Sequence, residues 1–302
     1  MAVLNFKQTK IVLFSFFILL LLLGCSQHES NEASFVFIEN DESVELLENN
    51  NLVFCYQKKD KSMDGKFTRN NYIHPLMSID GDTLTEDFPP DHLHHRGIFW
   101  AWHQIYIDTL HVSDSWALNN FKSEIVSVEN KIINNIAELS TRVFWESPLF
   151  NNGKPYVEEN TKIVVSPLSN GTRKINFNIT LNALTNGVKI GGSENEKGYG
   201  GFSLRIKMPD ELKFRSKDGT VTPQNLQINA GSWMKFSAPF GKSGKIGSIK
   251  LVCDKDSPNY PQPWILRQHR SMQNVVFPGR ELVEIPLNKP LKLSYTIYIE
   301  RN

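Results

Sequence analysis

The alternation of apolar and polar residues along this chain most constrains its fold. In residues 174–182, Lys-Ile-Asn-Phe-Asn-Ile-Thr-Leu-Asn, every second side chain is apolar, and residues 293–299 repeat the pattern near the C-terminus. A period of two places the apolar side chains on one face of an extended strand and the polar ones on the other. Such strands are typical of antiparallel sheets that bury one face.

Further strands are predicted in residues 121–129, 136–145, 199–208 and 226–236. Turn dipeptides separate the strand segments, at Asp64-Gly65, Asp80-Gly81, Asn152-Gly153, Asn186-Gly187 and Asp218-Gly219. No segment keeps the period of an amphipathic helix for more than about one turn. The sequence therefore predicts an all-β fold, a large antiparallel β-sandwich of the jelly-roll or supersandwich type with few short helices.

The N-terminus has the features of an export signal. Lys7 and Lys10 precede an apolar run over residues 11–23, which is too short for an ordinary membrane-spanning helix. The following Gly24-Cys25 completes a sequence that resembles a bacterial lipobox, so we predict a lipoprotein signal peptide over residues 1–24 and lipidation of Cys25. An ordinary cleaved signal and an anchoring helix are the alternatives.

The rest of the chain is predicted to be a polar tether, residues 25–33, and one β-sandwich catalytic domain, residues 34–302. The lipid would hold the protein in the cell envelope, at the outer membrane or its periplasmic face. A net charge of +1 without a run of like charges predicts no nucleic-acid partner. Cys55 and Cys253 could form one disulfide or remain two buried thiols.

A histidine-rich segment is the main candidate for chemistry. Five of the eight histidines lie between His92 and His111, beginning with Asp91-His92-Leu93-His94-His95-Arg96-Gly97 and continuing to His103. Pro89 and Pro90 indicate an extended approach, in which His92 and His94 share one side and His95 points away unless a bulge at Gly97 turns it. His74, before Pro75, could lie on an adjacent strand.

Three hypotheses fit this segment. The histidines could act as acid and base without a metal, because imidazole exchanges protons near neutral pH. His92 and His94, with His95 or Asp91, could instead hold Zn²⁺ or Fe²⁺. The third possibility is a hydrogen-bonded polar loop with no catalytic role.

Two later segments could complete a site. Tyr199, which follows Gly198 in a glycine-rich turn, could donate a proton, and Arg205 could bind an anion. Trp264 could stack on a sugar face, with Arg267 gripping a carboxylate through a bidentate pair. An ordinary hairpin and a packed edge loop are the structural alternatives.

The sequence resembles the PmoA-like family of secreted bacterial proteins over most of residues 70–280. The resemblance rests on Tyr72-Ile73-His74-Pro75 and on the block from Asp87 to Gly97, with weaker support from Gly198-Tyr199-Gly200-Gly201 with Arg205 and from Pro263-Trp264 with Arg267. It implies carbohydrate degradation. In particular, it implies a carbon–oxygen lyase that removes water from the terminal uronic acid of an oligosaccharide.

Chemistry assigns the roles for such a dehydratase. Arg96, with Arg205 or Arg267, would neutralise the uronate carboxylate and the charge that develops during proton abstraction. His95 and His103 would act as base and acid, with Tyr199 as a further proton donor. The substrate would contact the residues His74, Asp91, His92, His94, Trp100, Arg205, Trp264 and Arg267. No cofactor and no metal are expected, and a non-catalytic glycan-binding protein that uses Trp100 and Trp264 as platforms is the alternative.

Overall fold

The computed structural model describes residues 34–301, and these form one compact unit. The predicted signal peptide, the lipidated Cys25 and the tether lie outside the described residues. No helix in the described part has the length and apolar character needed to cross a membrane.

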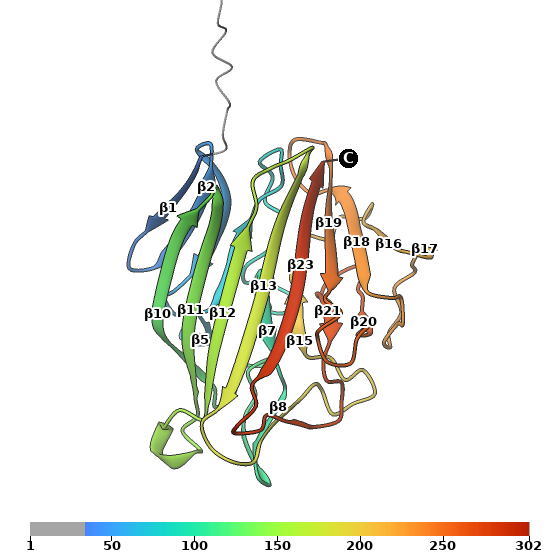
Figure 1. Cartoon of the computed structure of the whole chain (residues 1–302). Helices are drawn as coiled ribbons and strands as arrows, with labels where there is room; N and C mark the ends of the chain where they lie inside the picture. The colour runs from blue at the N-terminus through green and yellow to red at the C-terminus, as the bar shows by residue number, and fades with distance from the viewer. Residues whose placement is uncertain (1–33, 302) are drawn as a thin grey trace, which may run out of the picture. The chain divides into compact units, whose positions relative to one another are not determined.

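Two large sheets dominate the fold (Figure 1). The first has the spatial order β1 (Phe35–Glu39), β2 (Ser43–Glu48), β3 (Asn51–Gln57), β6 (Tyr72–Leu76), β7 (Ile98–Ala101), β15 (Gly201–Leu204), β21 (Gln273–Val276) and β20 (Trp264–Ile265). The second has the order β10 (Lys122–Ile133), β11 (Ile136–Glu146), β12 (Val157–Val165), β13 (Thr172–Ala183), β23 (Leu291–Arg301), β19 (Ile246–Cys253), β18 (Trp233–Pro239), β16 (Lys213–Ser216) and β17 (Gly219–Thr220).

Smaller elements complete the unit. A four-stranded sheet has the order β22 (Val283–Glu284), β14 (Val188–Gly191), β8 (Gln104–Ile107) and β9 (Leu110–Ser113), and β4 (Lys61–Met63) pairs with β5 (Lys66–Arg69). A short 3-10 helix, η1 (Asn151–Gly153), is the only helix within residues 34–301. All the paired strands are antiparallel. The predicted all-β antiparallel fold is confirmed.

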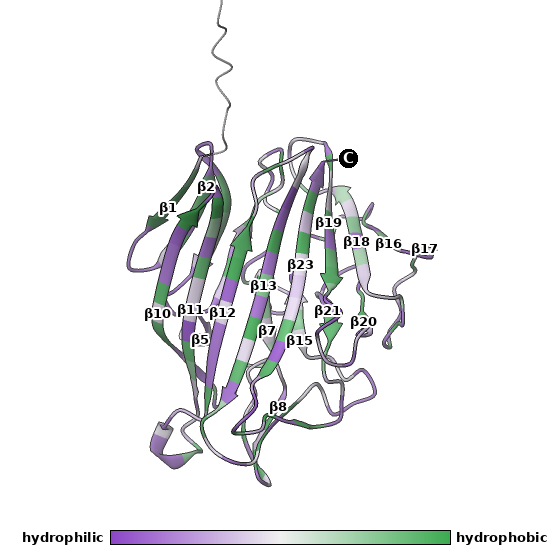
Figure 2. Ribbon diagram, viewed as in Figure 1, coloured by the Kyte–Doolittle hydropathy of each residue, from purple (hydrophilic) through white to green (hydrophobic). Residues whose placement is uncertain are grey.

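The predicted period of two places side chains as expected in the long strands. Along β13, Ile175, Phe177, Ile179 and Leu181 are buried between the two large sheets. The alternating apolar and polar bands on these strands are visible in Figure 2. Burial of each such side chain stabilises the fold by about 1.5–3 kcal/mol.

Two predicted strands are shorter than the sequence suggested. Of residues 199–208 only 201–204 form a strand, and of residues 226–236 only those from Trp233 do. Gly198 and Gly231 have positive φ values of 55° and 81°, which turn the chain away from the extended conformation ahead of each strand.

Strand β7 connects the main core to the functional site. Ile98 and Trp100 face the core between the large sheets. Phe99 and Ala101 face the other way, into a smaller apolar cluster on the outer face of the first sheet. The same cluster contains Trp116, and Tyr199 packs against it. This outer face carries the candidate site.

The predicted sugar platforms are wrong, because both tryptophans belong to the main core. Trp100 is 5% exposed and stacks on Phe202 with ring centroids 6.2 Å apart. Trp264 is 0% exposed, and its indole nitrogen donates a hydrogen bond to the carbonyl of Gly231 at 2.9 Å. Neither ring can stack on a ligand.

The two cysteines of the domain are buried and unpaired. Cys55 lies on β3 of the first sheet and Cys253 on β19 of the second. Of the two alternatives for these thiols, the structure therefore has the free pair.

Candidate active site

Gly97 anchors the histidine segment to the first sheet. Its amide donates to the carbonyl of Glu86 at 2.8 Å, and its carbonyl accepts from the amide of Arg205 at 2.7 Å. Gly97 has a φ of +47°, and a Cβ atom there would lie 1.8 Å from the carbonyl oxygen of Ile73. Only glycine fits this position without displacing backbone.

The segment before Gly97 is a tight turn, whereas an extended run was predicted. The amide of His92 donates to the carbonyl of Pro89 at 3.1 Å, and that of His95 donates to the carbonyl of His92 at 2.9 Å. The turn stacks the imidazoles of His92 and His95 with centroids 4.7 Å apart, and the ring of His94 meets His95 edge-on at 4.4 Å. Three imidazoles that an extended strand would separate are thus grouped.

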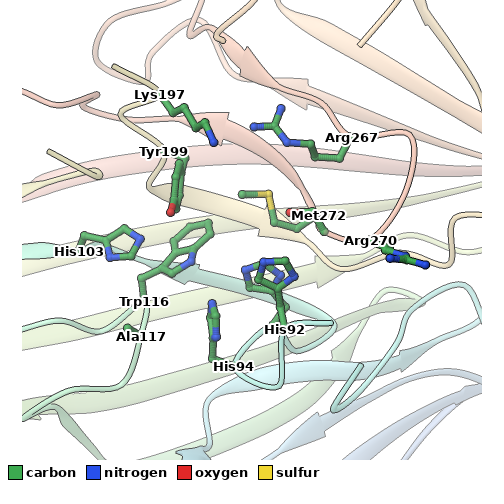
Figure 3. A pocket seen from close by; sticks show the side chains of 12 residues that line it. His92, His94, His103, Trp116, Ala117, Lys197, Tyr199, Arg267, Arg270 and Met272 are labelled. Atoms are coloured by element: carbon green, nitrogen blue, oxygen red, sulfur yellow. The ribbon is translucent and has the colours of Figure 1, made fainter. Parts of the chain in front are cut away.

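These rings form one wall of a pocket of about 350 Å³ (Figure 3). The imidazoles that line it are His92, His94, His95 and His103. Trp116, Ala117, Met272 and Tyr199 supply further surface. A volume of this size is within the range of about 300–1,000 Å³ found for small-molecule sites.

The pocket carries positive charge. Lys197, Arg267 and Arg270 line it, and Figure 3 places Lys197 and Arg267 on the side opposite His94. Within residues 34–301, its lining includes no carboxylate. A site of this composition favours an anionic ligand, because cations in a partly enclosed space attract negative charge and no acid competes for them.

His103 has the geometry of a general base. Its Nδ1 lies 2.9 Å from a carboxylate oxygen of Asp114, whose other oxygen accepts hydrogen bonds from the amides of Trp116 at 2.8 Å and Ala117 at 2.7 Å. Since an ionised carboxylate only accepts, the proton of a neutral His103 resides on Nδ1 and Nε2 carries the lone pair. Nε2 is buried and has no hydrogen-bond partner within the described residues.

A second imidazole is oriented in the same way. Nδ1 of His92 lies 2.8 Å from Asp91, and Arg205 holds the two oxygens of Asp91 at 2.8 and 2.6 Å. Burial opposes ionisation of Asp91, but the hydrogen bonds from Arg205 and His92 outweigh it and lower the pKa of this carboxyl. Asp91 is therefore a positioning residue behind His92, and it does not line the pocket.

The other two imidazoles are held neutral by their surroundings. Burial, with a contribution from Arg69, lowers the pKa of His94 to about 4. His95 is 2% exposed, and burial together with His94 lowers its pKa much further. Both ring nitrogens of His95 lack a partner within residues 34–301. With so low a proton affinity, His95 is a weaker base than the sequence suggested.

Tyr199 lies against His103 and Trp116. Its ring meets theirs edge-on, with centroids 5.0 and 5.1 Å apart, and its hydroxyl points toward them in Figure 3. Burial and the charge of Asp114 raise the pKa of Tyr199, so the phenol keeps its proton at neutral pH. It can donate that proton to a group bound beside His103.

Arg96 does not line the pocket, and its predicted role as a carboxylate clamp is wrong. Its side chain is 0% exposed and lies 3.1 Å above the ring of Phe88. The guanidinium donates to Asp87 at 3.1 Å, to the hydroxyl of Tyr72 at 3.2 Å and to the carbonyl of Phe67 at 2.7 Å. These groups occupy its donors, so Arg96 anchors the loop.

Two more predicted contacts are absent. Arg205 is 3% exposed and is held by Glu86 and Asp91, beside a separate hollow. His74 donates to or accepts from the hydroxyl of Thr85 at 3.0 Å, and it does not line the pocket. Both predictions of direct substrate contact are therefore wrong, because these side chains are engaged within the fold.

Arg267 does reach the pocket, as predicted. Its two terminal nitrogens also donate to the carbonyls of Gln224 and Asn225, at 2.8 and 3.0 Å, which fixes the direction of the guanidinium. Burial lowers its pKa. In all, six of the predicted site residues meet here: His92, His94, His95, His103, Tyr199 and Arg267.

Sequence reasoning missed several residues of the site. Asp114 and Trp116 follow β9 in a short turn, and nothing in their local sequence distinguishes them from surface loop residues. Lys197 precedes the glycine-rich turn at Gly198, and that proximity was the one available signal. Arg270 follows Arg267 in the same loop, after Gln268 and His269.

The histidine cluster does not have the geometry of a metal centre. Within residues 34–301, no group of three or more His, Cys, Asp or Glu side chains is arranged to hold a metal ion. His92 and His95 lie face to face, so their nitrogen lone pairs do not converge on a common point.

Comparisons with known proteins give a family and a distant structural likeness. No curated protein matches the sequence. Among solved structures, the chain is similar to the crystal structure of a candidate mutarotase (YeaD) from Salmonella typhimurium, at 9% identity and a TM-score of 0.33, over 90% of this chain and 92% of that one. A family model described as a family of unknown function (DUF6807) matches residues 43–302. Since that match spans most of the sequence, the chain belongs to the DUF6807 family.

Proposed function

We propose that the pocket binds the terminal uronic acid of an oligosaccharide and removes water from it by metal-free acid–base catalysis. The observation that carries the proposal is the composition of the pocket. Four imidazoles, two of them oriented by carboxylates, face a space that, among residues 34–301, is lined by three cations and no acid.

The cations supply the carboxylate site. Lys197, Arg267 and Arg270 would bind the uronate group and stabilise the negative charge that develops on it when the adjacent C–H bond breaks. Arg267 is the best oriented of the three, because two backbone carbonyls fix its guanidinium. It takes the role that the sequence assigned to Arg96.

His103 and Tyr199 supply the proton transfers. Nε2 of His103 takes the proton from C5, and the electrons of that bond form the C4–C5 double bond. The C4–O bond breaks as Tyr199 gives its proton to the departing oxygen, so one water leaves. The proton on His103 then returns to Tyr199, and both groups are restored. Each such transfer contributes roughly 10²–10⁴ to the rate.

The test is incubation of the purified full chain with uronic-acid-ended oligosaccharides after treatment with a metal chelator. We expect a product lighter by one water, with the ultraviolet absorbance of an alkene conjugated to a carboxylate. Matched substrates whose carboxylate is methyl-esterified should react poorly. Unchanged mass for all uronate substrates, or turnover that needs added metal, would contradict the proposal.

A further inference from the structure

We infer that the site is two-lobed and that the second lobe binds a neutral sugar next to the terminal uronate. A second hollow, of about 620 Å³, is also lined by His103 and Tyr199. Because these two residues line both spaces, the spaces adjoin at the reacting groups. This inference deepens the proposed function and rests on it.

The two lobes differ in charge. In the described part of the chain, the first is lined by Lys197, Arg267 and Arg270 without a carboxylate, whereas the second is lined by Asp114 and Glu194 without lysine or arginine. An anionic residue is therefore favoured in the first lobe and disfavoured in the second. A sugar that offers only hydroxyl groups suits the second lobe, since carboxylates and amides accept hydrogen bonds from hydroxyls.

One loop supplies both lobes. Residues 193–195 line the second lobe, Lys197 lines the first, and Tyr199 lines both. Hydrogen bonds within the loop hold its shape: the amide of Ser193 donates to the carbonyl of Tyr199 at 2.9 Å, and the amide of Gly198 donates to the carbonyl of Asn195 at 3.1 Å.

The two ends of the loop approach each other closely at a glycine. A Cβ atom on Gly192 would lie 2.2 Å from the carbonyl oxygen of Gly198. The side-chain amide of Gln104 donates to the carbonyl of Gly192 at 2.9 Å and ties the loop to β8. The loop that lines both lobes is thus preorganised, which limits the ordering cost of binding a ligand that contacts both.

His111 also lines the second lobe. Its Nε2 lies 3.1 Å from the carbonyl of His103, and its ring stacks on Tyr106 with centroids 4.8 Å apart. Because Nε2 donates to that carbonyl, a neutral His111 keeps its lone pair on Nδ1. The ring is exposed and can accept a hydrogen bond from a bound hydroxyl.

The experiment compares two substrates on the full chain. One is a methyl glucuronide, and the other is a disaccharide with the same uronate linked to a neutral hexose. We expect kcat/KM for the disaccharide to exceed that for the monosaccharide by about tenfold or more, as one or two added hydrogen bonds to charged groups predict. In Glu194→Gln, which keeps the shape of the side chain but removes its charge, this ratio should fall toward one.

Glu196→Gln is the matched control. Glu196 belongs to the same loop, is exposed and lines neither lobe, so the ratio should keep its wild-type value. A wild-type ratio near one, or an equal ratio in wild type and Glu194→Gln, would overturn the second lobe while leaving the proposed function standing. Failure of both substrates to turn over would overturn the proposed function, and this inference with it.

Discussion

Histidines in this chain differ in chemistry because their neighbours differ. His103 and His92 each have a carboxylate at Nδ1, whereas His95 is buried among aromatic rings with no hydrogen-bond partner within residues 34–301. The carboxylates orient the imidazoles and favour the tautomer with a lone pair at Nε2. Burial without a carboxylate partner makes an imidazole a weaker base, because burial lowers the affinity of the ring for a proton.

Replacement of His103 by Ala should therefore slow catalysis strongly. We expect kcat to fall by roughly 10²–10⁴, the usual effect of losing a general base. The melting temperature should change little, because His103 is partly exposed. His269→Ala, which removes an exposed imidazole outside the pocket, is the control and should keep wild-type kcat. Equal activity of His103→Ala and wild type would exclude His103 as the base.

The buried imidazoles should also make stability depend on pH. The pKa of His94 is lowered to about 4 and that of His95 further, whereas both titrate near 6.5 in the unfolded chain. Between about pH 6.5 and pH 4 the unfolded chain binds more protons, so the free energy of unfolding falls as the pH falls. Down to about pH 4 the two imidazoles should contribute about equally, because each is neutral in the folded chain and protonated in the unfolded one; below that pH only His95 continues to destabilise the fold.

Denaturant unfolding at pH 7.5 and 5.0 measures this effect. When the pH is lowered from 7.5 to 5.0, the free energy of unfolding of His95→Phe should fall less than that of wild type. The reason is that the phenyl ring has no proton to gain when the chain unfolds. The same pH dependence in both proteins would show that His95 is not its source.

At the scale of elements, the loop between β6 and β7 is held at its ends and its middle. Gly97 contacts the backbone of β6. Arg96 is buried, donates a hydrogen bond to Asp87 and packs on the ring of Phe88. Arg205, from the end of β15, fixes Asp91 and through it His92. Arginines that sequence alone suggested for substrate binding instead make the turn rigid.

Gly97→Ala should lower the free energy of unfolding, because it disturbs the backbone of this loop. The left-handed backbone alone costs about 1–2 kcal/mol for alanine, and the approach of Cβ to the carbonyl of Ile73 adds to that cost. Gly81→Ala is the matched control, because Gly81 has a φ of +86° but no atom within 4 Å of its Cβ position. Denaturant unfolding should show a loss of unfolding free energy in Gly97→Ala well above the loss in Gly81→Ala. Equal losses in the two variants would contradict the steric argument.

At the scale of the whole molecule, the two large sheets share one core and the site lies on the opposite face of the first sheet. Strand β7 serves both, since alternate side chains face the core and the cluster beneath the pocket. The sandwich is therefore the support on which the loops of the site are arranged.

Trp100→Ala tests the division between core and site. We expect a loss of about 3–5 kcal/mol in the free energy of unfolding, typical of removing a large buried aromatic side chain. Trp233→Ala, at a half-buried position where the ring contacts Lys250, should cost far less. Loss of ligand affinity without loss of stability in Trp100→Ala would restore this ring as a sugar platform.

The sequence by itself determined the all-β fold and the location of the candidate site. Alternation is a local property of an extended chain, so it is legible in residues 174–182 without knowledge of any partner strand. The grouping of histidines between His92 and His103 is likewise visible in the sequence alone, and these histidines line the pocket.

Only the tertiary structure decided which side chains line the pocket. Alternation shows that Trp100 and Phe99 face opposite ways, but not which face meets the second sheet. The pairing of His103 with Asp114 and the enclosure of Arg96 depend on contacts between loops and strands. Such contacts follow from how the sheets pack and how loops close over them, and no local pattern encodes them.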